Sequence, residues 1–211
     1  MLHRGRYKGF GRAEMRALAR GVVGWPGVEA DHGVSLTTPQ EGYLKSLIQD
    51  GLLTAVAGGK SARPVEVTYP TQTLLDRALG YRPPIRPIDT VRFVQAVIAG
   101  RLRQGGRAIE SHASWIRGLR GRPSAPTRPL GTLVHVFRHL RPLLLAGRDR
   151  CVLDSFALLK FLSISGASLK DISWVVGVRM RGPAHCWLQS GALVINDTPE
   201  RVRQYKPIFV A

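Results

Sequence analysis

The fold is decided by an apolar stretch that opens with a cysteine: Asp149-Arg150-Cys151-Val152-Leu153-Asp154-Ser155-Phe156-Ala157-Leu158-Leu159. Its pattern predicts a helix over 151–165, with Asp149 placed to cap the start and Gly166 to end it. A cysteine in the first turn of a helix lies at the positive end of the helix dipole, which lowers the thiol pKa and favours the thiolate. Cys151 is therefore a candidate nucleophile, although a lone cysteine is more often a buried structural thiol.

A strand and a hairpin are predicted after this helix. Residues 172–180 alternate as a strand does, and the segments 184–189 and 193–197 flank the turn signal Ser190-Gly191-Ala192. Helix, strand and hairpin in this order are typical of the papain and transglutaminase class of folds. In that class the cysteine opens the helix and the histidine lies on the sheet.

The hairpin contains the other two members of a candidate triad. His185 and Asp197 are equally distant in sequence from Gly191, so a three-residue loop over 190–192 would set them directly opposite each other on one face. A two-residue turn would shift the register by one residue and send them to opposite faces. We predict the first register, in which Asp197 orients His185 and His185 holds the proton of Cys151.

Other residues near this constellation have simpler interpretations. Cys186 is the rival nucleophile, but on a strand its side chain points away from that of His185, which predicts a place in the core. Trp187 shares the face of His185, where it either shields the His–Asp pair from water or packs in the core. His135 and His139 have the i, i+4 spacing of metal ligands, yet no third ligand accompanies them. No metal site and no cofactor-binding residue is therefore predicted.

The chain separates into two regions near residue 81, where Gly80-Tyr81-Arg82-Pro83-Pro84-Ile85-Arg86-Pro87 forms a proline-rich linker. We therefore predict domains over 1–80 and 81–211. In the first, strands are expected over 34–36 and 65–69, and a helix begins with Thr38 as N-cap, which suggests a winged-helix-sized module. In the second, three helices are predicted before the cysteine, over 88–103, 107–120 and 132–145.

The 211-residue chain is strongly basic, with a formal net charge of +17, and residues 101–150 hold eleven arginines against Glu110 and Asp149. This charge fits a solvated surface or a site for an acidic peptide better than nucleic acid, for which no zinc-finger or RNA-binding motif is present. The sequence has no run of 18 apolar residues and no secretory signal, and its two cysteines suit a reducing compartment. We expect a cytoplasmic protein that does not bind nucleic acid.

Four segments in series carry a family resemblance: Cys151 with its helix, Val175-Val176-Gly177-Val178-Arg179, Ala184-His185-Cys186-Trp187 and Val194-Ile195-Asn196-Asp197-Thr198-Pro199. They resemble the leader peptidases of lasso-peptide biosynthesis, and most closely the fused B protein of the microcin-type and proteobacterial pathways. The match covers about residues 150–200, and the chain length and a separate N-terminal module also agree. Cys186 departs from the family, which usually carries a small residue at that position.

The resemblance implies an α+β protein with two parts. The C-terminal part would be a papain/transglutaminase-like cysteine protease, with Cys151 as nucleophile, His185 as general base and then acid, and Asp197 as orienting carboxylate. The N-terminal part would be a winged-helix-like module that binds the leader peptide as an added strand. The enzyme would cut a ribosomally made precursor between leader and core before the macrolactam ring closes.

The resemblance also implies partners. They are the precursor peptide, an asparagine-synthetase-like cyclase that closes the ring, and a membrane exporter. Cleavage in the family is regarded as ATP-dependent, but this chain has no recognisable nucleotide motif. We therefore expect no bound cofactor and an ATP requirement that resides in the cyclase.

Sequence alone leaves two other functions open. The same Cys-His-Asp trio serves acyl transferases of the transglutaminase and arylamine acetyltransferase types, which pass the acyl group to an amine instead of to water. A basic winged-helix nucleic-acid-binding protein with an inert C-terminal domain would instead lose affinity steeply with salt and be indifferent to Cys151→Ala.

Overall fold

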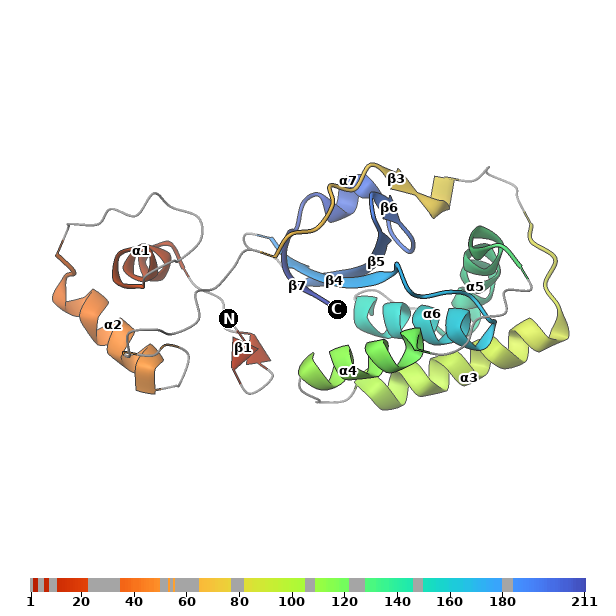
Figure 1. Ribbon diagram of the computed structural model, residues 1–211, viewed down its shortest axis with the longest axis horizontal. Coiled ribbons are helices and arrows are strands. Elements are labelled where there is room, and N and C mark those ends of the chain that lie inside the picture. Colours follow the sequence, from red (N-terminus) through yellow and green to blue (C-terminus); the bar gives the residue numbers. More distant parts are fainter. Residues whose placement is uncertain are drawn as a thin grey trace. The chain divides into compact units, whose positions relative to one another are not determined.

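The computed structural model divides the chain into two compact units, Met1–Pro64 and Val65–Ala211 (Figure 1). The residues that it describes are 2–3, 6–7, 11–22, 35–49, 53, 55, 65–76, 82–104, 109–121, 128–145, 150–179 and 184–211. Within these ranges, no helix combines the length and the apolar character needed to cross a lipid bilayer.

The N-terminal unit contains a short antiparallel strand pair and two helices: β1 (Leu2–His3), β2 (Arg6–Tyr7), α1 (Arg12–Gly21) and α2 (Thr38–Gln49). The two helices pack through a small apolar core of Leu18, Leu44 and Leu47. Between the helices, Ser35 and Leu36 are not in a strand, so the predicted strand over 34–36 is wrong for these two residues; Val34 lies outside the described residues. The winged-helix assignment of this unit stays a prediction.

The start of α2 lies one residue from its predicted position. Thr37, not Thr38, is the N-cap, because its carbonyl accepts a hydrogen bond from the Glu41 amide at 3.0 Å. The Thr37 amide in turn donates to the Gln40 side chain at 3.0 Å. This hydrogen bond is one half of a capping box, in which the side chain of the third helical residue accepts from the N-cap amide.

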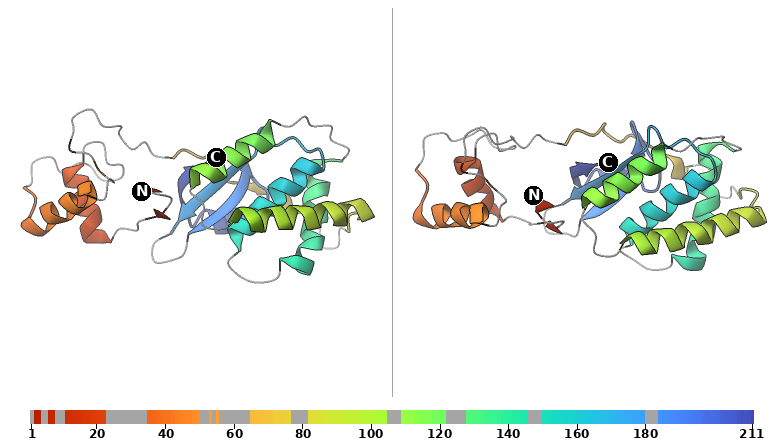
Figure 2. Two further views of the ribbon diagram at one scale, coloured as in Figure 1. Left: turned by 90° about the horizontal axis from the view of Figure 1, so that it is seen from below. Right: turned by 60° about the horizontal axis from the view of Figure 1, so that its bottom comes forward.

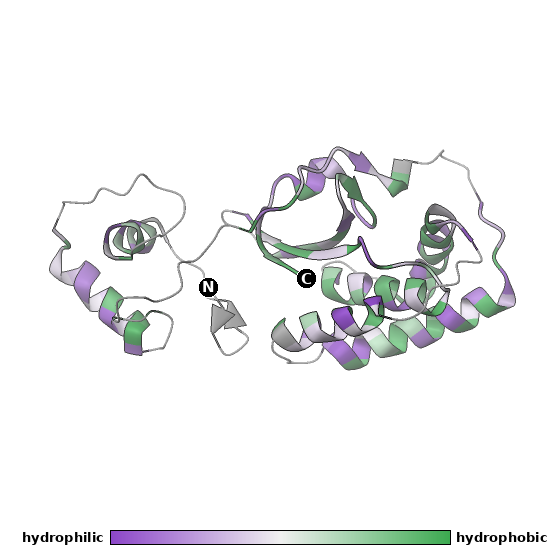
Figure 3. Ribbon diagram, viewed as in Figure 1, coloured by the Kyte–Doolittle hydropathy of each residue, from purple (hydrophilic) through white to green (hydrophobic). Residues whose placement is uncertain are grey.

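Four helices form one layer of the C-terminal unit: α3 (Pro87–Gln104), α4 (Ile109–Arg120), α5 (Leu130–Leu144) and α6 (Cys151–Ile164). Helix α6 is the central one, because α3, α4, α5 and a strand of the sheet all pack against it. This central position suits the mostly apolar composition of α6 (Figure 3). Its side chains from Ser155 to Leu159 are all buried. The three helices predicted before the cysteine and the helix predicted at it are confirmed to within a few residues.

The second layer is a mixed five-stranded sheet with the order β3-β6-β5-β4-β7. Its strands are β3 (Gln72–Thr73), β4 (Ser173–Val178), β5 (His185–Ser190), β6 (Leu193–Val194) and β7 (Lys206–Val210). The β3–β6 pair is parallel and the other pairs are antiparallel. A short 3-10 helix, η1 (Leu74–Asp76), follows β3, and α7 (Pro199–Val202) precedes β7. The turned views show α3, α4 and α6 on one side of the curved sheet (Figure 2).

The boundary between the compact units lies earlier than the predicted one near residue 81. Gln72 and Thr73 pair with Leu193 and Val194, which ties the segment 65–76 to the C-terminal sheet. The strand predicted over 65–69 is wrong, since residues 65–71 are not in a strand. Burial still alternates over 65–68, where Val65 and Val67 are partly buried while Glu66 and Thr68 are exposed, and Val67 packs against the core; the alternation ends at Tyr69, which is 66% exposed.

Helix α6 begins and ends close to the predicted residues. Its N-cap residue is Arg150, whose carbonyl accepts from the Asp154 amide at 2.8 Å, while Asp149 lies outside the described residues. At the other end, Gly166 has φ 79°, a left-handed conformation that glycine adopts without strain. The Ala167 amide then donates to the Leu162 carbonyl at 3.0 Å and closes the helix.

Candidate active site

Cys151 is the first residue of α6 and is half-buried. The first backbone N–H groups of a helix have no acceptor within it, so they point positive charge at whatever lies before them. The thiol therefore lies where an anion is stabilised. It faces the end of β5 that carries His185, and both residues line one cavity.

The hairpin brings Asp197 to His185, but in a different register from the predicted one. Ser190 pairs with Leu193, so the loop is the two-residue turn Gly191-Ala192, and the prediction of a three-residue loop is wrong. Gly191 takes φ 54°, the left-handed conformation that such a tight turn requires. A regular continuation of this register would place Asp197 on the face opposite to His185.

Asp197 reaches His185 because strand β6 stops at Val194. The Asn196 side chain, in place of a main-chain carbonyl, accepts a hydrogen bond from the Leu188 amide at 2.8 Å. The backbone is thereby released to bend over residues 195–197. His185 Nε2 then lies 2.6 Å from Asp197 Oδ2, and both residues are buried.

Asp197 is held from two further directions. Its Oδ1 accepts from the Thr198 amide at 2.8 Å, and its main-chain carbonyl accepts from the Thr73 hydroxyl at 2.7 Å. With Nε2 of His185 committed to this carboxylate, Nδ1 is the ring nitrogen left for the thiol of Cys151. The structure thus brings the three predicted residues together in the order thiol, imidazole, carboxylate.

Two aromatic rings enclose the imidazole of His185. Trp187 stacks on it, with ring centroids 6.1 Å apart and an interplanar angle of 23°, and Tyr205 lies against it at 5.0 Å. The Trp187 indole N–H donates to the Gln189 side chain at 2.8 Å, which fixes the ring. Trp187 therefore both packs in the core and shields His185 from water.

Electrostatics favour an ion pair between Cys151 and His185. The hydrogen bond from the Cys186 thiol, together with the one from His185, outweighs burial and lowers the pKa of Cys151 to about 4. Burial disfavours the imidazolium, but the hydrogen bonds with Asp197 and Cys151 outweigh it and raise the pKa of His185 to about 9. Between these two values the site holds a thiolate and an imidazolium, the reactive state of a cysteine hydrolase.

Cys186 has a second role besides the predicted core position. It is buried, as predicted, but it also lines the cavity, and its sulfur lies 3.8 Å from the Ser155 hydroxyl on α6. Burial, and then the neighbouring Cys151, raise the pKa of Cys186 well above its ordinary value. It therefore stays a neutral thiol that can donate to the Cys151 thiolate and is a poor nucleophile itself.

The cavity has a volume of about 770 Å³. Its lining comes from η1, α5, α6, β5, α7 and the adjacent loops: Leu75, Val134, Phe137, Arg138, Arg141, Pro142, Arg150, Cys151, Asp154, Leu158, Ala184, His185, Cys186, Asn196, Asp197, Arg201 and Tyr205. Sequence reasoning assigned no role to Tyr205, Asn196 or the four arginines, because no spacing rule links them to the cysteine. Among the described residues, no group of three or more His, Cys, Asp or Glu side chains could hold a metal ion.

The pH dependence of Cys151 alkylation checks the ion pair. A depressed thiol pKa keeps the thiolate at every pH above about 4 and removes it as pH falls through that value. The rate of alkylation by iodoacetamide is therefore expected to be nearly constant from about pH 5 to pH 8, where an ordinary thiol of pKa about 8.5 gains about tenfold per pH unit. Mass spectrometry of the labelled peptide identifies the modified cysteine.

Cys186→Ala provides the matched control for this profile. The variant lacks the thiol that lowers the pKa of Cys151, so the midpoint of its rate profile is expected to move to higher pH. A wild-type rate that climbs through pH 7–9 would show that Cys151 is an ordinary thiol.

The packing around His185 predicts the effect of a methyl group at Gly177. A Cβ there would lie 2.9 Å from Tyr205 Cβ and 3.0 Å from two ring atoms of Trp187. Because Tyr205 Cβ is attached directly to the backbone, Gly177→Ala is expected to lower the free energy of unfolding by about 1–3 kcal/mol. Urea denaturation measures it. Gly118→Ala on α4, where nothing lies within 4 Å, is the control and is expected to stabilise by up to about 1 kcal/mol.

A comparison with known protein families matches residues 94–210 to the transglutaminase-like superfamily. The matched segment contains all three residues of the candidate triad and the whole of α6. No curated protein matches the chain, and no solved structure does.

Proposed function

Because the chain belongs to the transglutaminase-like superfamily, we propose that it is a cysteine peptidase that removes the leader peptide from a ribosomally made lasso-peptide precursor. One observation carries the peptidase assignment: Cys151 lies at a helix start beside His185, which in turn is bonded to Asp197 at 2.6 Å. The leader-peptidase assignment is supported by the sequence resemblance of the four segments around these residues.

The proposed mechanism follows from this geometry. The Cys151 thiolate attacks the scissile carbonyl, and N–H groups at the start of α6 stabilise the oxyanion. The His185 imidazolium gives its proton to the leaving amine, which departs and leaves a thioester. Neutral His185 then takes a proton from water, the resulting hydroxide attacks the thioester, and the carboxylate product leaves Cys151. Asp197 orients the imidazole and stabilises its charge in both steps.

The N-terminal unit is proposed to bind the leader peptide. The described part of this unit contains the strand pair β1–β2, and a short sheet of this kind can accept a peptide as an added strand. The proposed partners are the precursor and an asparagine-synthetase-like cyclase, with a membrane exporter downstream. Both cysteines are free thiols, which suits a reducing cytoplasm as the place of action.

An acyl transferase is the second candidate, because the superfamily and the trio are compatible with transfer to an amine as well as to water. The two functions differ only in what attacks the thioester. Mass spectrometry separates them directly, since hydrolysis adds the mass of one water to the fragments and transfer adds the mass of the amine.

The test is incubation of the purified chain with a synthetic precursor, with and without the cyclase and ATP. Cleavage at the leader–core junction is the expected result. Comparison of the incubations with and without ATP and cyclase shows whether any nucleotide requirement resides in this chain or in the cyclase. A product that carries an added amine would support the acyl transferase, and an intact precursor in every arm would contradict the leader peptidase.

A further inference from the structure

Four arginines line the cavity that contains Cys151: Arg138 on α5, Arg141 on α5, Arg150 directly before α6, and Arg201 on α7. They come from three separate parts of the chain and converge on one cavity. A merely solvated basic face would instead spread its arginines along the outside of one element. The convergence indicates that positive charge is concentrated at this place.

The two carboxylates in the lining are already engaged. Asp154 accepts from Arg141 Nε through both oxygens, at 2.8 and 3.0 Å. Asp197 is held by His185 at 2.6 Å and by the Thr198 amide at 2.8 Å. Arg201 Nε lies 3.8 Å from Asp197 Oδ2, the oxygen that His185 also contacts, and the Arg201 side chain is 58% exposed.

The other two arginines have no carboxylate partner in the described part of the chain. Arg138 donates to the Leu75 carbonyl at 3.3 Å, a neutral acceptor, and remains exposed. Arg150 is also exposed and pairs with no acidic side chain among the described residues. Arg138, Arg150 and Arg201 thus present guanidinium groups with unused donors at the mouth of the catalytic cavity.

A guanidinium offers a planar pair of N–H donors that matches a carboxylate, and such charge-assisted bonds strengthen where a cavity partly excludes water. From this arrangement we infer that the cavity has a subsite for a carboxylate of the substrate, formed by Arg138, Arg150 and Arg201 next to Cys151. The inference rests on the proposed function for the reaction and adds the substrate class: a peptide with a carboxylate close to the bond that is cut. We assign it to an acidic side chain, because the leader–core junction lies inside the precursor, and a free C-terminus is the other source that the peptide probes below distinguish.

Two small alkylating reagents test the subsite without any peptide. Iodoacetate carries a carboxylate and iodoacetamide is its neutral analogue; in each reaction the Cys151 thiolate forms a bond to carbon and iodide leaves with the C–I electron pair. The quantity measured is the second-order rate constant for iodoacetate divided by that for iodoacetamide, both at pH 7. Any change in the reactivity of the thiolate is common to both reagents and cancels in this ratio.

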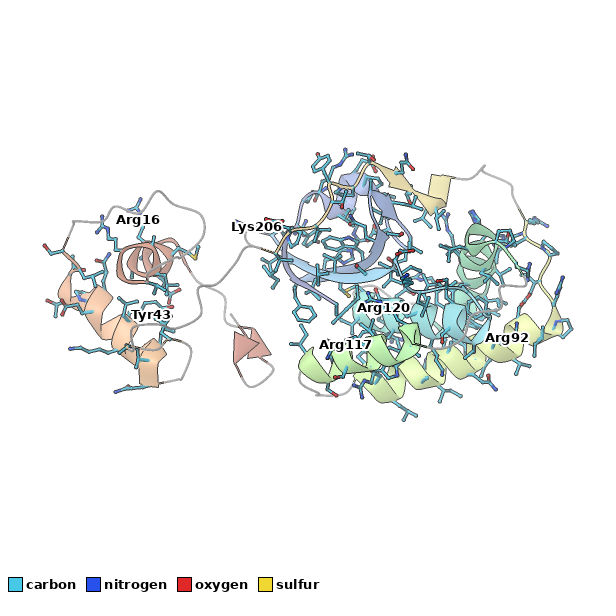
Figure 4. All side chains as sticks on the ribbon, in the orientation of Figure 1. Arg16, Tyr43, Arg92, Arg117, Arg120 and Lys206 are labelled. Carbon is cyan, nitrogen blue, oxygen red and sulfur yellow. The ribbon has the colours of Figure 1, made fainter. Side chains whose placement is uncertain are left out.

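The double variant Arg138→Gln and Arg150→Gln is expected to lower the ratio by about three- to tenfold, because two unit charges near the reagent are removed. Arg117→Gln is the matched control: Arg117 projects from α4, is exposed and does not line the cavity (Figure 4). A double variant with the wild-type ratio, while Cys151 still reacts with both reagents, would overturn the subsite and leave the proposed function intact. A Cys151 that is inert to both reagents would overturn the proposed function, and the subsite with it.

Protection of Cys151 from iodoacetamide identifies the source of the carboxylate. The probes are three tetrapeptides with an acetylated N-terminus: one with a central glutamate and an amidated C-terminus, one with glutamine in its place, and the glutamine peptide with a free C-terminal acid. Stronger protection by the first peptide assigns the subsite to an acidic side chain, and stronger protection by the third assigns it to a terminal carboxylate. Equal protection by all three would overturn it.

Discussion

Cys151→Ala is expected to reduce cleavage of the precursor at the leader–core junction by about 10⁴-fold or more, because the variant has no thiolate to attack the carbonyl. Residual cleavage would come only from binding and from the amides at the start of α6. Single-turnover digestion followed by mass spectrometry measures the loss.

The control for this prediction is the fold of the variant. Cys151 is the half-buried first residue of α6, and alanine is a good helix former, so the variant should keep the helix content of wild type, which circular dichroism measures. Equal cleavage by the two proteins would move the nucleophile to Cys186 or to a contaminant and would contradict the mechanism above.

Asp197→Asn is expected to lower the cleavage rate by roughly 10³–10⁴-fold. Asparagine can still accept from the Thr198 amide, so the local fold is retained, but it carries no charge to stabilise the His185 imidazolium. Since the hydrogen bond with Asp197 helps to hold the pKa of His185 at about 9, the variant should lose the imidazolium at a lower pH. The alkaline limit of activity is therefore expected to shift to lower pH, a change that a purely structural role would not cause.

Asp171→Asn is the matched control for Asp197→Asn, since Asp171 is an exposed residue in the turn before β4. It should retain the wild-type rate and pH profile. An Asp197→Asn variant within tenfold of wild type, with an unchanged alkaline limit, would show that Asp197 is not the orienting carboxylate.

Local patterns predicted the helix that carries the candidate nucleophile well. The apolar run after Cys151 and the glycine at 166 predict α6 almost to the residue, because its composition and its left-handed end are local signals in and just after the helix. The helical spacing of apolar residues likewise predicts α3, α4 and α5 to within a few residues. The mixed α+β character of the C-terminal part also follows from these patterns.

Non-local packing explains what the sequence did not predict. The approach of Asp197 to His185 depends on the Asn196 side chain, which replaces a main-chain group as the acceptor for the Leu188 amide, and no turn rule anticipates that replacement. The strand expected over 65–69 failed because the sheet pairs the chain slightly later, at Gln72–Thr73. Cys186 lines the cavity although alternation placed it in the core, since the thiol lies on the side of the strand that faces α6. The arginines of the cavity come from segments that only the fold brings together.

The short strand β3 has a consequence for how the two units of this protein can be separated. Thr73 holds the backbone of Asp197 through its hydroxyl, and Leu75 forms part of the cavity wall. The segment that follows the N-terminal unit is therefore part of the candidate active site before it reaches the proline-rich linker. A fragment cut at that linker would lack part of the candidate active site, whereas one that starts at Val65 would keep it whole. The boundary of the C-terminal part is thus set by the support of Asp197 and not by the prolines.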